Sequence, residues 1–452
     1  MKKLLSRKWI QNLTDQQRDI LLGLFIVLIV AIVYYFQWAY YLTGLEGSKV
    51  NIDQPERYFW WANDSRSYRD VGEWLFGRST ITSIDHRPWL YPLILGLSRT
   101  LFGGSAEGVV WIAQFLMWLG SGALIYLSLQ STTRSTIPAM FGAGFFFSHP
   151  SPLILTFHGM TETLNIFLIS AFCWVLTTTM KNRVDYALLL MALATVTKPI
   201  YLLFLILLVI YVLVQDKRSN PMDKQSTPQS GSVDRRSSPV DKPASRWKQA
   251  GMIVLLLLPI WVQLLLSTIA VGKPALSTIG SYTFKNYLVA DVYLRTEGTE
   301  WRETMGLIED WDLRQQLSYL WDHQRMTLLT VRSHLIDSNL LVGSFFTLGE
   351  GNRMKEFASN LNAVAAYLHL LMLPLVIYYM LSAKYRDHKE IIALLYICFL
   401  LQFLTSGIST GQDDRLLITA LPLWIIAYLS VLKGISTART APDQSVSNVG
   451  TR

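Results

Sequence analysis

The sequence is short of charge and of cysteine. Only 16% of its 452 residues are charged and 51% are hydrophobic, with a mean hydropathy of +0.30. Soluble domains usually carry about 25% charged residues, so this composition excludes an ordinary cytosolic enzyme and a disordered chain. The 2 cysteines, Cys173 and Cys398, lie within apolar runs. They predict neither a disulfide framework nor a metal site.

Long apolar runs are what the sequence has instead. A helix needs roughly 20 mostly apolar residues to cross the hydrocarbon core of a bilayer. The short run Tyr186–Thr197 is interpreted as half of a broken helix. Together the runs predict an all-α polytopic membrane protein with about ten transmembrane helices: Ile20–Leu42, Ala106–Gln130, Ile137–Thr156, Glu162–Met180, Tyr186–Thr197, Ile200–Gln215, Gly251–Val271, Leu361–Leu381, Ile391–Ser406 and Leu416–Leu432.

The distribution of charge predicts the orientation of these helices. Ten spans place both termini on one side. The segments on that side carry a net charge of +12, whereas the whole chain carries +8. The opposite loops 43–104 and 272–360 carry net charges of zero and −2. Because cytoplasmic loops are enriched in Lys and Arg, both termini are predicted to be cytoplasmic. The protein would lie in the plasma (inner) membrane, or in the endoplasmic reticulum of a eukaryote, and its basic residues need no nucleic-acid partner.

Composition also divides the chain into four parts. Residues 1–215 form an N-terminal transmembrane module with outer loop 43–104, and residues 249–433 form a second module with outer loop 272–360. The linker 216–248 and the tail 434–452 are predicted to be disordered, because they contain few aliphatic residues to bury. Apolar residues at helical spacing in Ser65–Phe76 and Pro88–Phe102 predict juxtamembrane helices in the first outer loop.

Charged and polar motifs collect at the predicted outer face. Each has a purely structural interpretation: Asp64 as a helix N-cap, Glu162 as the first residue of a helix, the histidines as core residues and the cations as interfacial anchors. Their convergence on one face nevertheless favours an active site. The motifs are Asp64-Ser65-Arg66-Ser67-Tyr68, Asp85-His86-Arg87-Pro88, His149-Pro150, His158 to Glu162, Lys198-Pro199 and Asp413-Asp414-Arg415.

In this order the motifs resemble those of the C-type superfamily of membrane glycosyltransferases, which includes the protein O-mannosyltransferases and the aminoarabinose transferases of lipid A. The similarity covers about residues 20 to 432. One of its elements is the run Arg87-Pro88-Trp89-Leu90-Tyr91-Pro92-Leu93 before the second span. Many relatives have Arg where this chain has Lys198, and Arg-Tyr where it has Arg415-Leu416. These departures leave the sugar and the acceptor open.

The resemblance implies a transferase that moves a sugar from a polyprenyl-phosphate donor to a hydroxyl group of a glycan, lipid or protein acceptor, in the biosynthesis of cell-envelope polysaccharides or related products. Asp64 is predicted to be the general base, and Glu162 is predicted to assist it or to orient the acceptor. Substrate binding is predicted for Tyr68, Arg87, His158, Lys198 and Arg415. No cofactor is predicted, and no metal-ligand motif supports a divalent cation.

Two other functions fit parts of the sequence. A transporter or flippase for a lipid-linked saccharide would also need buried charge, but the sequence has no internal repeat and few ionisable residues within its apolar runs. A polysaccharide polymerase or ligase would use basic residues of the large outer loops. Candidates for that role are Arg295, Arg302, Arg314, Arg325 and Arg332.

Overall fold

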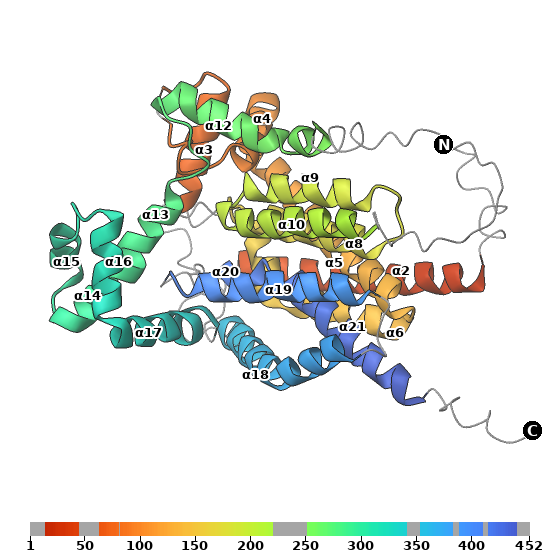
Figure 1. The fold of residues 1–452 in the computed structure, drawn as a ribbon. Helices are drawn as coiled ribbons and strands as arrows, with labels where there is room; N and C mark the ends of the chain where they lie inside the picture. The colour runs from red at the N-terminus through yellow and green to blue at the C-terminus, as the bar shows by residue number, and fades with distance from the viewer. Residues whose placement is uncertain are drawn as a thin grey trace, which may run out of the picture.

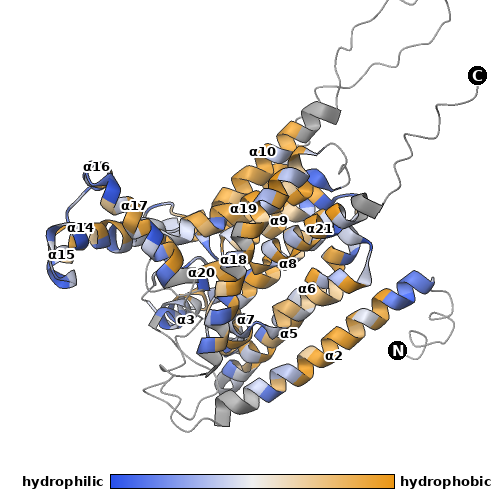
Figure 2. Ribbon diagram, turned by 90° about the horizontal axis from the view of Figure 1, so that it is seen from below, coloured by the Kyte–Doolittle hydropathy of each residue, from blue (hydrophilic) through white to orange (hydrophobic). Residues whose placement is uncertain are grey.

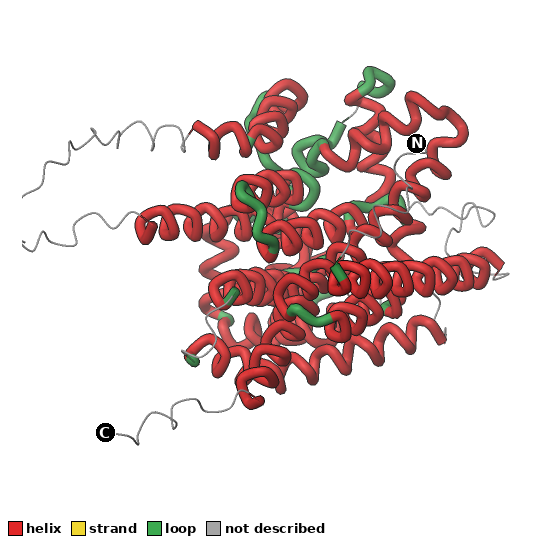
Figure 3. The backbone as a smooth tube through the Cα atoms, turned by 90° about the vertical axis from the view of Figure 1, so that its right-hand side faces the viewer, coloured by secondary structure: helices red, strands yellow, loops and turns green. Residues whose placement is uncertain are grey.

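A computed structural model describes residues 14–44, 63–80, 82–219, 251–340, 353–382, 388–409 and 415–440. Within these ranges the chain forms helices, turns and loops but no strand (Figure 3). The all-helical prediction is therefore confirmed for the described part of the chain.

A bundle of roughly parallel helices makes up most of the molecule (Figure 1). Helix α5 lies at its centre and packs against α2, α6, α8 and α21, while α9 packs against α8 and α10. The helices of the bundle are α2 (Asp15–Gly44), α5 (Ala106–Thr133), α6 (Thr136–Ser148), α8 (Glu162–Thr177), α9 (Arg183–Thr195), α10 (Leu202–Ser219), α19 (Lys389–Ser406) and α21 (Leu421–Thr440).

The outward faces of the bundle are apolar, as Figure 2 shows by colour. Phe25 is 61% exposed, Leu116 59% and Phe141 66%, which fits a hydrocarbon surrounding better than water. Three helical stretches are long and apolar enough to cross a membrane: Asp15–Trp38, Leu90–Thr133 and Lys389–Ser406. Several shorter apolar helices accompany them, so a membrane protein is indicated, whereas the number of ten spans stays a prediction.

A smaller helical region lies beyond one end of the bundle (Figure 1). It has its own apolar core around Val289, Val292 and Ile308. The long helix α18 (Arg353–Leu381) packs against α21 and α19. The elements of the smaller region are α13 (Ile279–Thr283), the π-helix η4 (Phe284–Val289), α14 (Ala290–Glu297), α15 (Trp301–Leu307), α16 (Leu313–Asp322), α17 (Gln324–Ser333) and the π-helix η5 (His334–Leu340).

Helices are present at both places where juxtamembrane helices were predicted in the first outer loop. They are α3 (Asn63–Leu75) and α4 (Leu90–Phe102), which pack against each other. The backbones approach closely at Gly72 and Gly96, where a Cβ added to Gly72 would lie 2.6 Å from the carbonyl oxygen of Pro92. A third helix, α12 (Leu258–Val271), lies beside this pair (Figure 1).

Three predicted spans are wrong in their continuity. The run Ile137–Thr156 is α6 followed by a break at His149, the short α7 (Pro150–Ile154) and the 3-10 turn η2 (Leu155–Phe157). Proline cannot supply the helical hydrogen bond, and the imidazole of His149 instead accepts from the backbone N–H of Ser151 at 3.3 Å. The run Gly251–Val271 has a turn at Leu257 before Pro259, and Leu416–Leu432 is divided between α20 (Arg415–Ile418) and α21.

The predicted disordered segments begin too early in the chain. Helix α10 continues to Ser219, so the first four residues of the predicted linker 216–248 are helical, and α21 continues to Thr440, seven residues into the predicted tail 434–452. The rest of both segments lies outside the described residues. So does the part of outer loop 43–104 from 45 to 62.

Candidate active site

Helix α3 presents the first predicted site residues on one face. Asp64, Ser67 and Tyr68 stand three and four positions apart, so their side chains lie on the same side of the helix. Asp64 lies inside the first turn, since α3 begins at Asn63, and its carboxylate binds arginines instead of capping the helix. The ring of Tyr68 is buried and meets the ring of Tyr91 edge-on at 5.6 Å.

Arg87 lies between α3 and α4 and is held by three residues of α3. Its guanidinium donates to Oδ1 of Asp64 at 2.7 Å and to Oγ of Ser67 at 2.9 Å. It also lies 3.5 Å from the hydroxyl of Tyr68 and 4.8 Å from the centre of that ring. Arg87 is therefore fixed by ionic, hydrogen-bond and cation–π contacts at once.

Arg415, at the start of α20, binds the second oxygen of the same carboxylate. Its Nη2 donates to Oδ2 of Asp64 at 3.0 Å, although the two residues are 351 positions apart. Burial raises the pKa of Asp64, but the charges of Arg415 and Arg87 outweigh it and hold that pKa below its ordinary value. Nη1 of Arg415 faces the sulfur of Met160 at 4.0 Å, and a thioether is a weak acceptor.

A second ion pair lies on the other side of the site. Glu162 is the first residue of α8 and is 3% exposed, and Nζ of Lys198 donates to its Oε1 at 3.3 Å. Lys198 follows α9 and precedes the 3-10 turn η3 (Pro199–Tyr201). Burial and the charge of Arg415 lower the pKa of Lys198, although Glu162 opposes them. Lys198 therefore lies in a site where positive charge is only partly compensated.

These residues line one cavity of about 640 Å³. It opens among the ends of α8, α9, α10, α19 and α20, and α3 and α13 complete its wall. Six of the seven predicted site residues line it: Asp64, Tyr68, Arg87, Glu162, Lys198 and Arg415. Their five charged groups leave a net charge of +1 at neutral pH, which suits an anionic ligand.

His158 does not line the cavity. It is 3% exposed, and burial and the charge of Arg415 lower its pKa to about 4 against the opposing effect of Glu162. The imidazole is therefore neutral at physiological pH, and the predicted contact of His158 with a phosphate is not supported by its position. His149 lies in the core against Asn362, at 2.9 Å. Asp413 and Asp414 lie outside the described residues.

Two buried glutamines that sequence reasoning missed position this site. Gln263 of α12 accepts from the backbone N–H of Trp89 at 3.1 Å and donates to the carbonyl of Ile84 at 2.9 Å. It thereby holds both ends of the segment that carries Arg87. Gln114 of α5 accepts from the hydroxyl of Tyr91 and donates to the carbonyl of His158 at 2.9 Å. A lone amide within an apolar run was the available signal for each.

Among the described residues there is no group of three or more His, Cys, Asp or Glu side chains that could hold a metal ion. Both cysteines are buried and unbonded to each other. No protein-family model matches the chain, and no curated protein matches it significantly.

Proposed function

We propose that the chain is an integral-membrane glycosyltransferase that moves a sugar from a polyprenyl-phosphate donor to an acceptor hydroxyl at the outer membrane face. The observation that carries the proposal is the meeting of Asp64, Arg87 and Arg415, from three distant parts of the sequence, at one cavity. The proposed architecture has ten spans with cytoplasmic termini. The short helix α9, proposed to be half of a broken helix, and the longer α10 meet beside the cavity at Lys198.

The charge of the cavity matches such a donor. A sugar linked to a polyprenyl phosphate carries one negative charge, which would neutralise the net charge of +1 in the cavity. When the sugar leaves, the lipid phosphate becomes a monoester with a charge of about −1.5 to −2 at pH 7. Arg415 and Lys198 then stabilise the charge that develops as the bond breaks, which is the usual source of electrostatic catalysis.

The reaction is a single displacement. The acceptor oxygen forms a bond to the anomeric carbon, the bond between that carbon and the phosphate oxygen breaks, and the acceptor proton passes to the Asp64 carboxylate. Attack from the face opposite to the phosphate inverts the anomeric configuration. A positioned carboxylate base contributes about 10²–10⁴-fold to such a step.

Donor binding would also strengthen the base. Both oxygens of Asp64 are bound by arginines and its pKa is low, so the carboxylate is ionised but weakly basic. A phosphate beside Arg415 brings one negative charge, which offsets the charge of that arginine. This raises the proton affinity of Asp64, so the base becomes most effective when the donor is in place.

Glu162 has a positioning role in this mechanism. Its carboxylate lies at the N-terminus of α8, where the helix dipole favours negative charge, and it holds Lys198 at 3.3 Å. We assign it the orientation of Lys198 toward the phosphate through Oε1. Its Oε2, which accepts from the hydroxyl of Thr161 at 3.5 Å, would orient the acceptor.

Both alternative functions are supported less well than sugar transfer. Transporters bind substrate near the membrane midplane, whereas the residues of this cavity lie at helix ends. For a polymerase or ligase that uses outer-loop arginines, those residues should face a cavity. All five are exposed, and none of them lines this cavity: Arg295, Arg302, Arg314, Arg325 and Arg332.

The proposal is tested by incubating the purified chain with a panel of radiolabelled polyprenyl-phosphate sugars and a mixture of membrane-derived acceptors. We expect release of polyprenyl phosphate from one donor, and a product whose anomeric configuration by NMR is opposite to that of the donor. Retention of configuration would contradict the single displacement, and no release from any donor would contradict the transferase function.

A further inference from the structure

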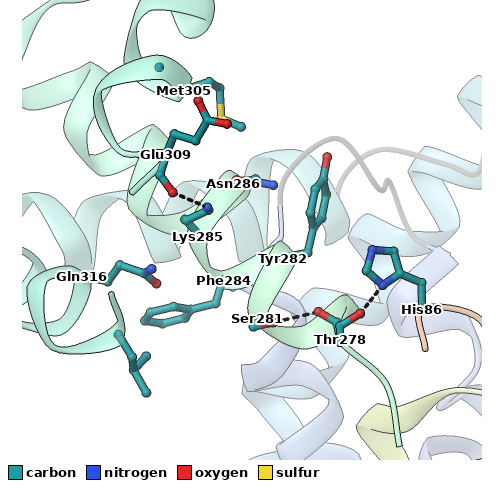
Figure 4. A pocket seen from close by; sticks show the side chains of 12 residues that line it. His86, Thr278, Ser281, Tyr282, Phe284, Lys285, Asn286, Met305, Glu309 and Gln316 are labelled. Atoms are coloured by element: carbon teal, nitrogen blue, oxygen red, sulfur yellow. Dashed lines mark hydrogen bonds between the residues drawn. The ribbon is translucent and has the colours of Figure 1, made fainter. Parts of the chain in front are cut away.

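A second cavity of about 770 Å³ lies beside the first, within the smaller helical region (Figure 4). The two cavities share His86 and Tyr282 in their walls. Helix α13 separates them elsewhere, because Ile279 and Gly280 line the first cavity while Ser281 lines the second. A ligand in the second cavity would therefore reach the first past His86 and Tyr282.

The lining of the second cavity differs in chemistry from that of the first. Its charged residues are Lys285 and Glu309, which balance, and Nζ of Lys285 already donates to the backbone carbonyl of Glu309 at 2.9 Å. The other polar groups are hydroxyls, amides and one imidazole, beside the aromatic rings of Tyr282 and Phe284. This combination fits a neutral, hydroxyl-rich ligand better than an anion.

Asn286 gives independent evidence for a ligand. Its side chain lines the cavity and is 5% exposed, and its Oδ1 is buried without a hydrogen-bond partner among the described residues. A buried acceptor without a donor is unfavourable unless a ligand supplies one. Asn286 belongs to the π-helix η4, a conformation often found at functional sites.

Tyr282 is placed to bind a sugar ring between the cavities. Its side chain is 47% exposed, and its ring lies 6.4 Å from the imidazole of His86. In Figure 4, these two rings lie at one side of the cavity and Phe284 and Gln316 at the other. The C–H face of a sugar packs on an aromatic ring, while its hydroxyls bind amides and hydroxyls such as those of Asn286 and Ser281.

We propose that the second cavity binds a saccharide acceptor, with its terminal residue stacked on Tyr282 and its attacking hydroxyl directed into the first cavity toward Asp64. This inference rests on the proposed transferase function and names its acceptor class. The volume lies within the range of roughly 300–1,000 Å³ that is usual for small-ligand sites.

The test is the binding of three uncharged trisaccharides, maltotriose, cellotriose and α-1,6-mannotriose, to the full chain in nanodiscs, measured by saturation-transfer NMR. At least one is expected to bind, and Tyr282→Leu and Asn286→Ala are each expected to weaken its binding about tenfold. Trp321→Leu is the matched control, because Trp321 is an aromatic residue of the same region that is 76% exposed and lines neither cavity.

Three results would overturn the inference. They are that no trisaccharide binds, that both variants bind as tightly as the wild type, or that a serine-containing hexapeptide displaces the bound trisaccharide. The same preparations are assayed for release of lipid phosphate from the labelled donor. Release without trisaccharide binding rejects the saccharide acceptor alone. Trisaccharide binding that depends on Tyr282, without release from any donor, rejects the transferase function alone.

Discussion

At the scale of single residues, the site is defined by how Asp64 is shared. Each of its two oxygens accepts from one arginine, at 2.7 Å from Arg87 and 3.0 Å from Arg415. The sequence predicted that all three residues face one side of the membrane, but their pairing could not be predicted. It depends on α20 meeting α3, and no local pattern encodes a contact across 351 positions.

The lowered pKa of Asp64 predicts a pH dependence. The ion pairs stabilise the fold above the unfolded-state pKa of about 3.9, and this contribution is lost as the pH falls through the lower folded-state pKa. The acid limb of kcat/KM, which reports the free enzyme, should accordingly lie below about pH 4. Arg87→Gln removes one of the cations that lower the pKa of Asp64 and should move this limb to higher pH.

The control for this profile is Arg302→Gln, since Arg302 is exposed and lines neither cavity. Its acid limb should coincide with that of the wild type. An unmoved limb in Arg87→Gln would show that a group other than Asp64 controls the acid side of the profile.

Variants of the buried pair Glu162–Lys198 should separate the contribution of the pair to stability from its contribution to activity. Glu162→Gln leaves Lys198 without its ion-pair partner, and breaking a buried pair costs about 3–5 kcal/mol. Thermal unfolding in detergent should therefore occur at a lower temperature. Adding Lys198→Met should restore most of the stability but no sugar transfer. Restoration of transfer in the double variant would refute a role for Lys198 in binding the donor phosphate.

At the scale of elements, the sequence predicted the presence of helices better than the residues at which they begin and end. Apolar composition over a sufficient length identifies α2, α5 and α19 as candidate membrane helices, because helices so apolar would be unstable in water. The break at His149 was missed because the apolar run continues through Pro150 and Pro152. Hydropathy treats those residues as part of a span, although proline cannot continue the hydrogen-bond ladder.

Helix α12 holds the segment that carries Arg87 through the amide of Gln263 and through the carbonyl of Pro259, which accepts from Nε1 of Trp89 at 3.0 Å. Gln263→Leu keeps the size of the side chain but leaves the N–H of Trp89 and the carbonyl of Ile84 unpaired, which should destabilise the protein by about 1–3 kcal/mol. A loosened Arg87 should raise the donor KM severalfold while the helical circular dichroism stays unchanged. The control is Gln130→Leu. Gln130 is also a buried glutamine but lies near the C-terminal end of α5, so this variant should leave KM unaltered. A wild-type KM in Gln263→Leu would contradict the positioning role.

At the scale of the whole molecule, the arrangement of ends agrees with the charge pattern. The first residues of α2 and the last residues of α10 and α21 lie at one end of the bundle, and α3 and α14–α17 lie at the other (Figures 1 and 2). The sequence predicted this division because net basic segments alternate along the chain with neutral or weakly acidic ones. It could not predict the second cavity, which is lined by residues of α13 and α16 together with His86 from a distant part of the chain.

The proposed orientation in the membrane can be tested by labelling. In intact cells, a membrane-impermeant maleimide should label Glu300→Cys, and it should label Lys181→Cys only after permeabilisation. Both positions are exposed, and the native Cys173 and Cys398 are buried, so the wild type should give little signal. Labelling of Lys181→Cys in intact cells would reverse the proposed topology.

The most direct test of the account is the turnover of a polyprenyl-phosphate sugar by Asp64→Asn, compared with its affinity for the lipid phosphate. The substitution removes the base but releases the charges of Arg87 and Arg415. We predict that transfer falls by at least about 100-fold, with lipid phosphate bound as tightly as by the wild type or more tightly. Transfer near the wild-type rate by purified Asp64→Asn protein would contradict the assignment of Asp64 as the base.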